Sequence, residues 1–204
     1  MKENKDNWVK YPTTLLGQTV DLRPLEKEHF EALETLAKDK RIWAFYAYDG
    51  SNPDVFSNIF NSALIEGDKG NQLPFTIFYK PENKIIGSTR FLDIQPQHKK
   101  LEIGSTWLHP DYWATVVNLE CKLLLLTHCF ENLKALRVQL KTDENNIRSR
   151  KAIEKIGGQF EGILRNDILR DINTHRYSAF FSIIDTEWAT VKSNLRDLYQ
   201  AKNK

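Results

Sequence analysis

Glu102 stands in a stretch, residues 101–108, whose alternating apolar residues predict a β-strand. In a regular strand Leu101, Ile103 and Trp107 share one face. Glu102 then points to the opposite face. Partial burial raises the pKa of a carboxylate, so that it can accept a proton near neutral pH. The pattern therefore predicts either a catalytic base or a carboxylate at a solvated edge of the sheet.

The segment after this strand connects it to a predicted helix that begins near Val117. Free backbone amides at a helix N-terminus form a ready binding site for an anion. The chain contains neither the GxxxxGK(S/T) pattern nor the GxGxxG pattern, which excludes a P-loop and a dinucleotide-binding turn. A plain connection without a ligand is the other interpretation of this segment.

A second helix start lies at Asn146, which is a suitable N-cap with Ser149 three residues further on. Arg148, Arg150 and Lys151 crowd the first turn of this helix. Exposed cations there oppose the helix dipole, at a cost of about 0.3–1 kcal/mol each. Either the acidic residues just upstream or the phosphates of a cofactor would offset that cost.

An aromatic cluster follows the first predicted helix and consists of Trp43, Phe45, Tyr46 and Tyr48. These side chains could wall a substrate pocket, with the nearby Asp49 or Asp54 attracting an amine. Aromatic clusters of this size are more often part of the core.

The elements follow the order β-α-α-β-β-β-α-β-α-β-β-α, which predicts an α/β fold of the α+β type. We expect one domain at residues 18–204, with a mixed, mostly antiparallel sheet, and an N-terminal arm at residues 1–17. The expected strands are 19–23, 75–80, 84–92, 101–108, 136–141, 159–169 and 175–184, and the expected helices are 26–38, 52–66, 117–131, 146–156 and 186–199.

Charge and composition limit the functional classes. The chain has 204 residues and a formal charge of +2, from 29 Lys and Arg against 27 Asp and Glu. That balance gives no support to binding of nucleic acid or of a membrane surface, and we interpret Arg165, Arg170 and Arg176 in the last hairpin as a solvated strand face. The two cysteines have no zinc spacing, so no metal is expected. The cytoplasm is the expected location.

Three stretches resemble the GNAT superfamily of acetyl-CoA-dependent N-acetyltransferases, and its RimJ/RimL-like branch in particular. They are TVDLRPL at 19–25, LEIGSTWLHPDYW at 101–113, and NIRS followed by IEKIG within 146–157. The resemblance implies a splayed pair of strands that holds the pantetheine arm of acetyl-CoA. It also implies that the pyrophosphate rests on amides of the loop at 113–118. The residues expected to bind the cofactor are Trp107, Leu108, Trp113, Ala114, Thr115, Val116, Val117, Asn118, Asn146 and Ser149.

This loop departs from the superfamily pattern Q/R-x-x-G-x-G/A, because Trp113, Val116 and Asn118 stand at its fixed positions. Glycine allows a positive φ, which β-branched residues such as Val116 and Val117 resist. If the loop keeps ordinary backbone angles, its amides can still point at the phosphates.

The resemblance also implies a direct transfer in which Glu102 deprotonates the amine through a water molecule. Ile153 stands where many members have a tyrosine, so Ser149, or a water molecule that it holds, is the expected proton donor to the leaving thiolate. The expected acceptor is a primary amine, on a protein or peptide N-terminus or on a small molecule, and the chain could form a homodimer. The alternative is a degenerate GNAT fold that binds CoA or regulates without catalysis.

Overall fold

The computed structural model describes residues 8–171 and 173–202, which form one eight-stranded sheet of order β1-β2-β3-β4-β5-β6-β8-β7. Its strands are β1 (Leu15–Leu16), β2 (Val20–Pro24), β3 (Leu73–Tyr79), β4 (Lys84–Gln95), β5 (Lys100–Leu108), β6 (Arg137–Asp143), β7 (Gln159–Asp171) and β8 (Thr174–Ile184). The helices are α1 (Phe30–Ala37), α2 (Pro53–Asp68), α3 (Val116–Thr127), α4 (Ile147–Lys155) and α5 (Trp188–Lys202).

Neighbouring strands are antiparallel except for β5 and β6, which run parallel. Their paired residues extend only over Lys100–Glu102 on β5 and Arg137–Gln139 on β6. Since β5 continues to Leu108 and β6 to Asp143, the two strands separate beyond that point. The predicted fold class, a mixed sheet with one splayed pair, is confirmed.

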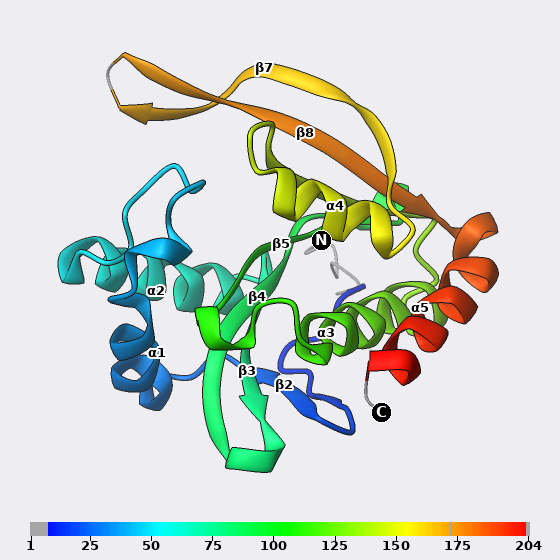
Figure 1. Cartoon of the computed structure of the whole chain (residues 1–204), viewed down its shortest axis with the longest axis horizontal. Helices are drawn as coiled ribbons and strands as arrows, with labels where there is room; N and C mark the ends of the chain where they lie inside the picture. Colours follow the sequence, from blue (N-terminus) through cyan, green and yellow to red (C-terminus); the bar gives the residue numbers. More distant parts are fainter. Residues whose placement is uncertain (1–7, 172, 203–204) are drawn as a thin grey trace, which may run out of the picture.

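Helices cover both faces of the sheet, and Figure 1 shows α1 and α2 on one side and α3 and α5 on the other. The apolar residues of α3 and α5 pack with the inner strands in the larger hydrophobic cluster. Those of α1 and α2 form a second cluster. The β7–β8 hairpin passes over α4 and extends toward the α2 side (Figure 1).

A bulge interrupts β5 at Ser105, whose φ is 46°. The register between β4 and β5 shifts at the same level, between Ser88 and Arg90. The prediction that Trp107 shares a face with Leu101 and Ile103 is therefore wrong. Trp107 packs in the α1–α2 cluster, whereas the other two belong to the larger cluster. One extra residue in a strand reverses the alternation beyond it.

The N-terminal segment is in contact with the rest of the chain from residue 8 onward. The Trp8 indole donates a hydrogen bond to the Leu133 carbonyl at 2.7 Å, and Val9 lies in the larger cluster. Residues 1–7 of the predicted arm lie outside the described residues. A domain boundary at residue 17 stays a prediction. None of the helices described is long and apolar enough to cross a membrane.

Candidate active site

A cavity of about 880 Å³ opens where β5 and β6 separate. Its wall comes from the loop after α1, from β5, from the first turns of α3 and α4, and from β8. Of the predicted site residues, the cavity brings together Glu102, Trp107, Leu108, Trp113, Ala114, Thr115, Asn118, Asn146 and Ser149.

The start of α3 forms one end of the cavity. Thr115 is its N-cap, and its hydroxyl accepts a hydrogen bond from the Val117 amide at 3.3 Å. Ala114, just before it, has a φ of 59°, whereas Val116 and Val117 are helical. The positive φ that would strain a β-branched valine is therefore adopted by Ala114, a smaller residue.

Neither valine forms part of the cavity wall, and Val117 is buried in the larger hydrophobic cluster. Val116 and Val117, which are predicted to contact the cofactor, could therefore do so only through their backbone amides. Those amides lie in the first turn of a helix, where the helix itself supplies no acceptor.

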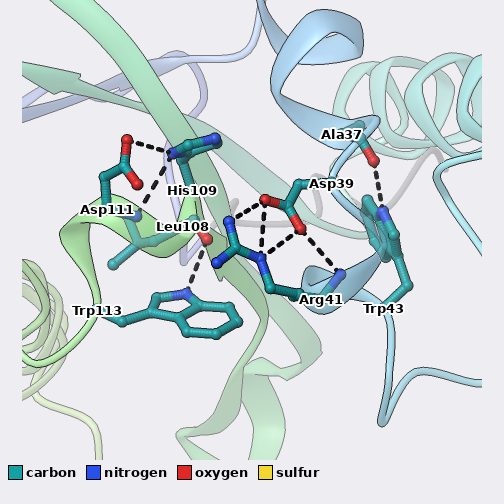
Figure 2. Close-up of polar contacts among 8 residues, drawn as sticks. All are labelled: Ala37, Asp39, Arg41, Trp43, Leu108, His109, Asp111 and Trp113. Carbon is teal, nitrogen blue, oxygen red and sulfur yellow. Dashed lines mark hydrogen bonds and ion pairs between the residues drawn. The ribbon is translucent and has the colours of Figure 1, made fainter.

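Trp113 is held between two elements at this end of the cavity. Its indole donates to the Leu108 carbonyl at 2.9 Å, as Figure 2 shows. The guanidinium of Arg148, from α4, lies 3.6 Å from the centre of its ring. Lys202 donates to the Ala114 carbonyl, so the end of α5 also reaches the loop.

Two cations lie at this end, Arg148 and Lys202, and Lys155 lines the cavity at the other end of α4. Together with two helix N-termini, Arg148 and Lys202 make a positive region that suits phosphate groups. The crowding of cations predicted for the α4 start is thus partly explained, since Arg148 turns toward the cavity. The amide of Ser149 donates to Asn146 Oδ1 at 3.0 Å, which confirms the predicted N-cap.

Glu102 is buried, with 3% of its surface exposed, which excludes a solvated edge. Its Oε2 accepts a hydrogen bond from Gln139 at 2.9 Å and lies 3.5 Å from Nζ of Lys141. Its Oε1 lies over Gly104, where an added Cβ would come within 2.7 Å of that oxygen. Because Gly104 has no side chain, there is space for Oε1 of Glu102. None of the described residues donates a hydrogen bond to this oxygen.

The aromatic cluster divides between the two predicted roles. Trp43 is core, and its indole donates to the Ala37 carbonyl (Figure 2). Phe45, Tyr46 and Tyr48 line the cavity instead. The Tyr46 hydroxyl donates to the Thr106 carbonyl at 2.8 Å, and burial raises the pKa of Tyr46, so this phenol stays protonated.

Asp49 does not serve the cavity as an amine-binding carboxylate. It accepts hydrogen bonds from the amide and the hydroxyl of Ser51 at 3.0 and 2.6 Å. Its side chain is a local turn cap.

Two charged cavity residues that sequence reasoning did not assign to the site are Arg176 and Lys122. Arg176 lies on β8 and lines the cavity, whereas Arg165 is exposed and Arg170 pairs with Asp143. The solvated-face interpretation therefore fails for Arg176. Lys122 on α3 lines the cavity too, although it is 6% exposed. The sequence signal that could have pointed to Lys122 is its position as a lysine beside the leucines of a predicted helix.

A model of the acetyltransferase (GNAT) domain family matches residues 19–159. The chain therefore belongs to this family, and it is an N-acetyltransferase of a RimJ/RimL-like kind. The match covers β2, the splayed pair and both helix starts at the cavity.

Known proteins show the same likeness. The chain is 24% identical over 182 residues to the putative ribosomal N-acetyltransferase YdaF of Bacillus subtilis, covering 86% of this chain and 97% of that protein. A putative acetyltransferase from T. thermophilus is 30% identical, with a TM-score of 0.82 and coverage of 93% of this chain and 98% of that one. Mycobacterium smegmatis RimJ, solved in complex with CoA-disulfide, has a TM-score of 0.77 at 18% identity, with coverage of 92% and 95%, and so shares the fold.

Proposed function

We propose that the protein transfers the acetyl group of acetyl-CoA directly to a primary amine. The observation that carries this proposal is one cavity with two chemically different ends. One end is lined by Arg148, Lys202 and two helix starts, and the other by Phe45, Tyr46 and Tyr48, with Arg176 close to the two tyrosines. The two ends adjoin along β5, so that a donor and an acceptor could meet there.

The donor end fits a nucleotide thioester. The first-turn amides of α3 and the Arg148 guanidinium would take the phosphates, and the gap between β5 and β6 would take the arm. Acetyl-CoA supplies the activated acyl group. Asn118 and Leu119 line the same path further along α3.

Glu102 would act as the base. Its free Oε1 would accept a proton from the acceptor ammonium through a water molecule, while Gln139 and Lys141 hold Oε2 in place. Backbone N–H groups near Leu108 would polarise the acyl carbonyl. Ser149 lines the cavity beside this path and would assist the departing thiolate.

The acceptor is a peptide N-terminus or a small amine. The relation to YdaF, named for ribosomal acetylation, favours a protein N-terminus. A cytoplasmic location and a homodimer stay predictions from the sequence.

A turnover assay with acetyl-CoA tests the proposal, with release of the CoA thiol measured against a panel of peptides and small amines. We expect saturable turnover with at least one amine, at a rate proportional to enzyme. Binding of acetyl-CoA without turnover on any amine would support the degenerate, regulatory alternative.

A further inference from the structure

Lys122 is a buried cation without a counterion among the described residues. It is 6% exposed, and an ammonium has three N–H donors. Among residues 8–171 and 173–202 it forms one hydrogen bond, from Nζ to the Thr106 hydroxyl at 3.0 Å, and no ion pair. A buried charge with so few partners is costly, which indicates that another group completes its contacts in the working protein.

The side chain lies at the inner end of the donor path. Thr115, Asn118, Leu119 and Lys122 occupy one stripe of α3 and all line the cavity. At a rise of about 1.5 Å per residue, Lys122 stands roughly 10 Å along the helix from Thr115. A donor whose phosphates bind at the helix start has an arm longer than this distance, so its thioester end can reach Lys122 when the arm is bent.

Thr106 marks the point where the two halves of the cavity meet. Its carbonyl accepts a hydrogen bond from Tyr46, on the acceptor side, and its hydroxyl accepts one from Lys122, on the donor side. The same hydroxyl lies 2.7 Å from that of Thr89 on β4. Lys122 thus reaches the strand position at which acyl transfer would occur.

We propose that Lys122 binds the thioester end of the donor and, in place of Ser149, supplies the proton to the departing CoA sulfur, an inference that rests on the proposed function. The amine nitrogen forms its bond to the acyl carbon, and the carbon–sulfur bond breaks with its electron pair on sulfur. A proton then moves from Nζ to sulfur and yields the CoA thiol. The proton that the attacking nitrogen loses restores the ammonium through water in the cavity.

The surroundings of Lys122 suit this role. Desolvation lowers the pKa of Lys122 to about 8, with a weak opposing effect from Cys121 on the same helix. The groups facing it from β4 and β5 are the uncharged hydroxyls of Thr89 and Thr106. Glu120, two residues away, binds backbone amides of residues 18–20, so it does not pair with Lys122.

The test compares Lys122→Met with wild type, using Lys38→Met, an exposed lysine at the end of α1, as the matched control. Three quantities are measured: kcat, the melting temperature, and the pKa of bound CoA thiol from its ultraviolet thiolate absorbance. The protein's own thiols do not interfere, because burial raises the pKa of Cys121 to about 12 and raises that of Cys129 well above its ordinary value.

We expect Lys122→Met to lower kcat by at least about tenfold, as for loss of a proton donor, to raise the melting temperature, and to raise the pKa of the bound thiol. A lysine that only ties α3 to β5 would instead lower the melting temperature and leave the thiol pKa unchanged, and that result would overturn the proposal. Absence of turnover and of CoA binding in wild type would mean that the proposed function itself fails. An altered thiol pKa without any wild-type turnover would still support the contact.

Discussion

Two buried charges two residues apart on α3 differ in how they are satisfied. The Glu120 carboxylate, 4% exposed, accepts hydrogen bonds from the amides of Gln18, Thr19 and Val20. Lys122, 6% exposed, donates only to Thr106 among the described residues. Burial alone does not separate a structural charge from a functional one, but the number of partners does.

The two charges also face different parts of the protein. Glu120 fixes the chain that leads into β2, whereas Lys122 faces the cavity. A fully bonded carboxylate stabilises the fold, and a poorly bonded ammonium costs stability until a ligand binds. Sites of function often carry such a cost.

Glu102 lies between these two cases, since Oε2 has partners and Oε1 has none among the described residues. If it is the base, Glu102→Gln should lower kcat by about 10²–10⁴-fold and leave acetyl-CoA affinity nearly unchanged. Steady-state kinetics and a binding titration measure both quantities. Gln139→Ala is the companion variant, because it removes one of the two partners of Oε2 without removing the carboxylate. Turnover that survives Glu102→Gln would remove this residue from the base role.

Glu120→Ala should destabilise the fold by about 3 kcal/mol, since three backbone donors lose their acceptor. Denaturant unfolding measures the change. At temperatures well below its melting point, folded Glu120→Ala should keep the kcat of wild type. A loss of kcat without a loss of stability would contradict the distinction between the two charges.

Lys122→Met should stabilise the free protein at pH 7 by roughly 2–3 kcal/mol. Lowering the pKa from 10.5 to about 8 costs about 3–4 kcal/mol at about 1.4 kcal/mol per unit, and the lost hydrogen bond to Thr106 offsets about 1 kcal/mol of that gain.

The advantage of methionine should depend on pH in a defined direction. Below pH 8 both folded and unfolded wild type carry the charged lysine, so the cost is fully present. Between pH 8 and 10.5 the unfolded chain binds more protons, so wild-type stability rises and the difference shrinks. Unfolding of both proteins at pH 7 and pH 10 checks this, and a constant difference would refute it.

Arg148→Ala should weaken acetyl-CoA binding by about tenfold, or about 1.4 kcal/mol, through loss of a cation at the phosphate end and of its contact with Trp113. Arg150→Ala is the matched control on the same turn, because Arg150 bonds the Glu144 carbonyl instead. An equal loss of acetyl-CoA affinity in the two variants would show that the net charge of the protein, and not the position of Arg148, determines binding.

Much of the fold was predictable because periodicity and turn residues report local structure well. Apart from β1, a strand that lies in the predicted N-terminal arm, the order of strands and helices follows from such patterns, as do the hairpin of β7 and β8 and the N-cap at Asn146. The bulge at Ser105 was not predictable, since a serine in a strand carries no signal for a positive φ. That one residue changed the face assigned to Trp107.

The site was predictable where a motif places residues near one another, as for Glu102 and the two helix starts. Lys122 and Arg176 escaped because their function depends on contacts across elements. A lysine in a helix usually reaches solvent, and only the fold shows that Lys122 meets Thr106.

The most direct measurement for the central claim is a calorimetric titration of acetyl-CoA into the full-length protein. We predict saturable binding at one site, with a dissociation constant between about 1 μM and 1 mM, the ordinary range for substrates of enzymes. Absence of saturable heat at millimolar acetyl-CoA, with the protein folded, would contradict the assignment of the cavity between β5 and β6 as the donor site.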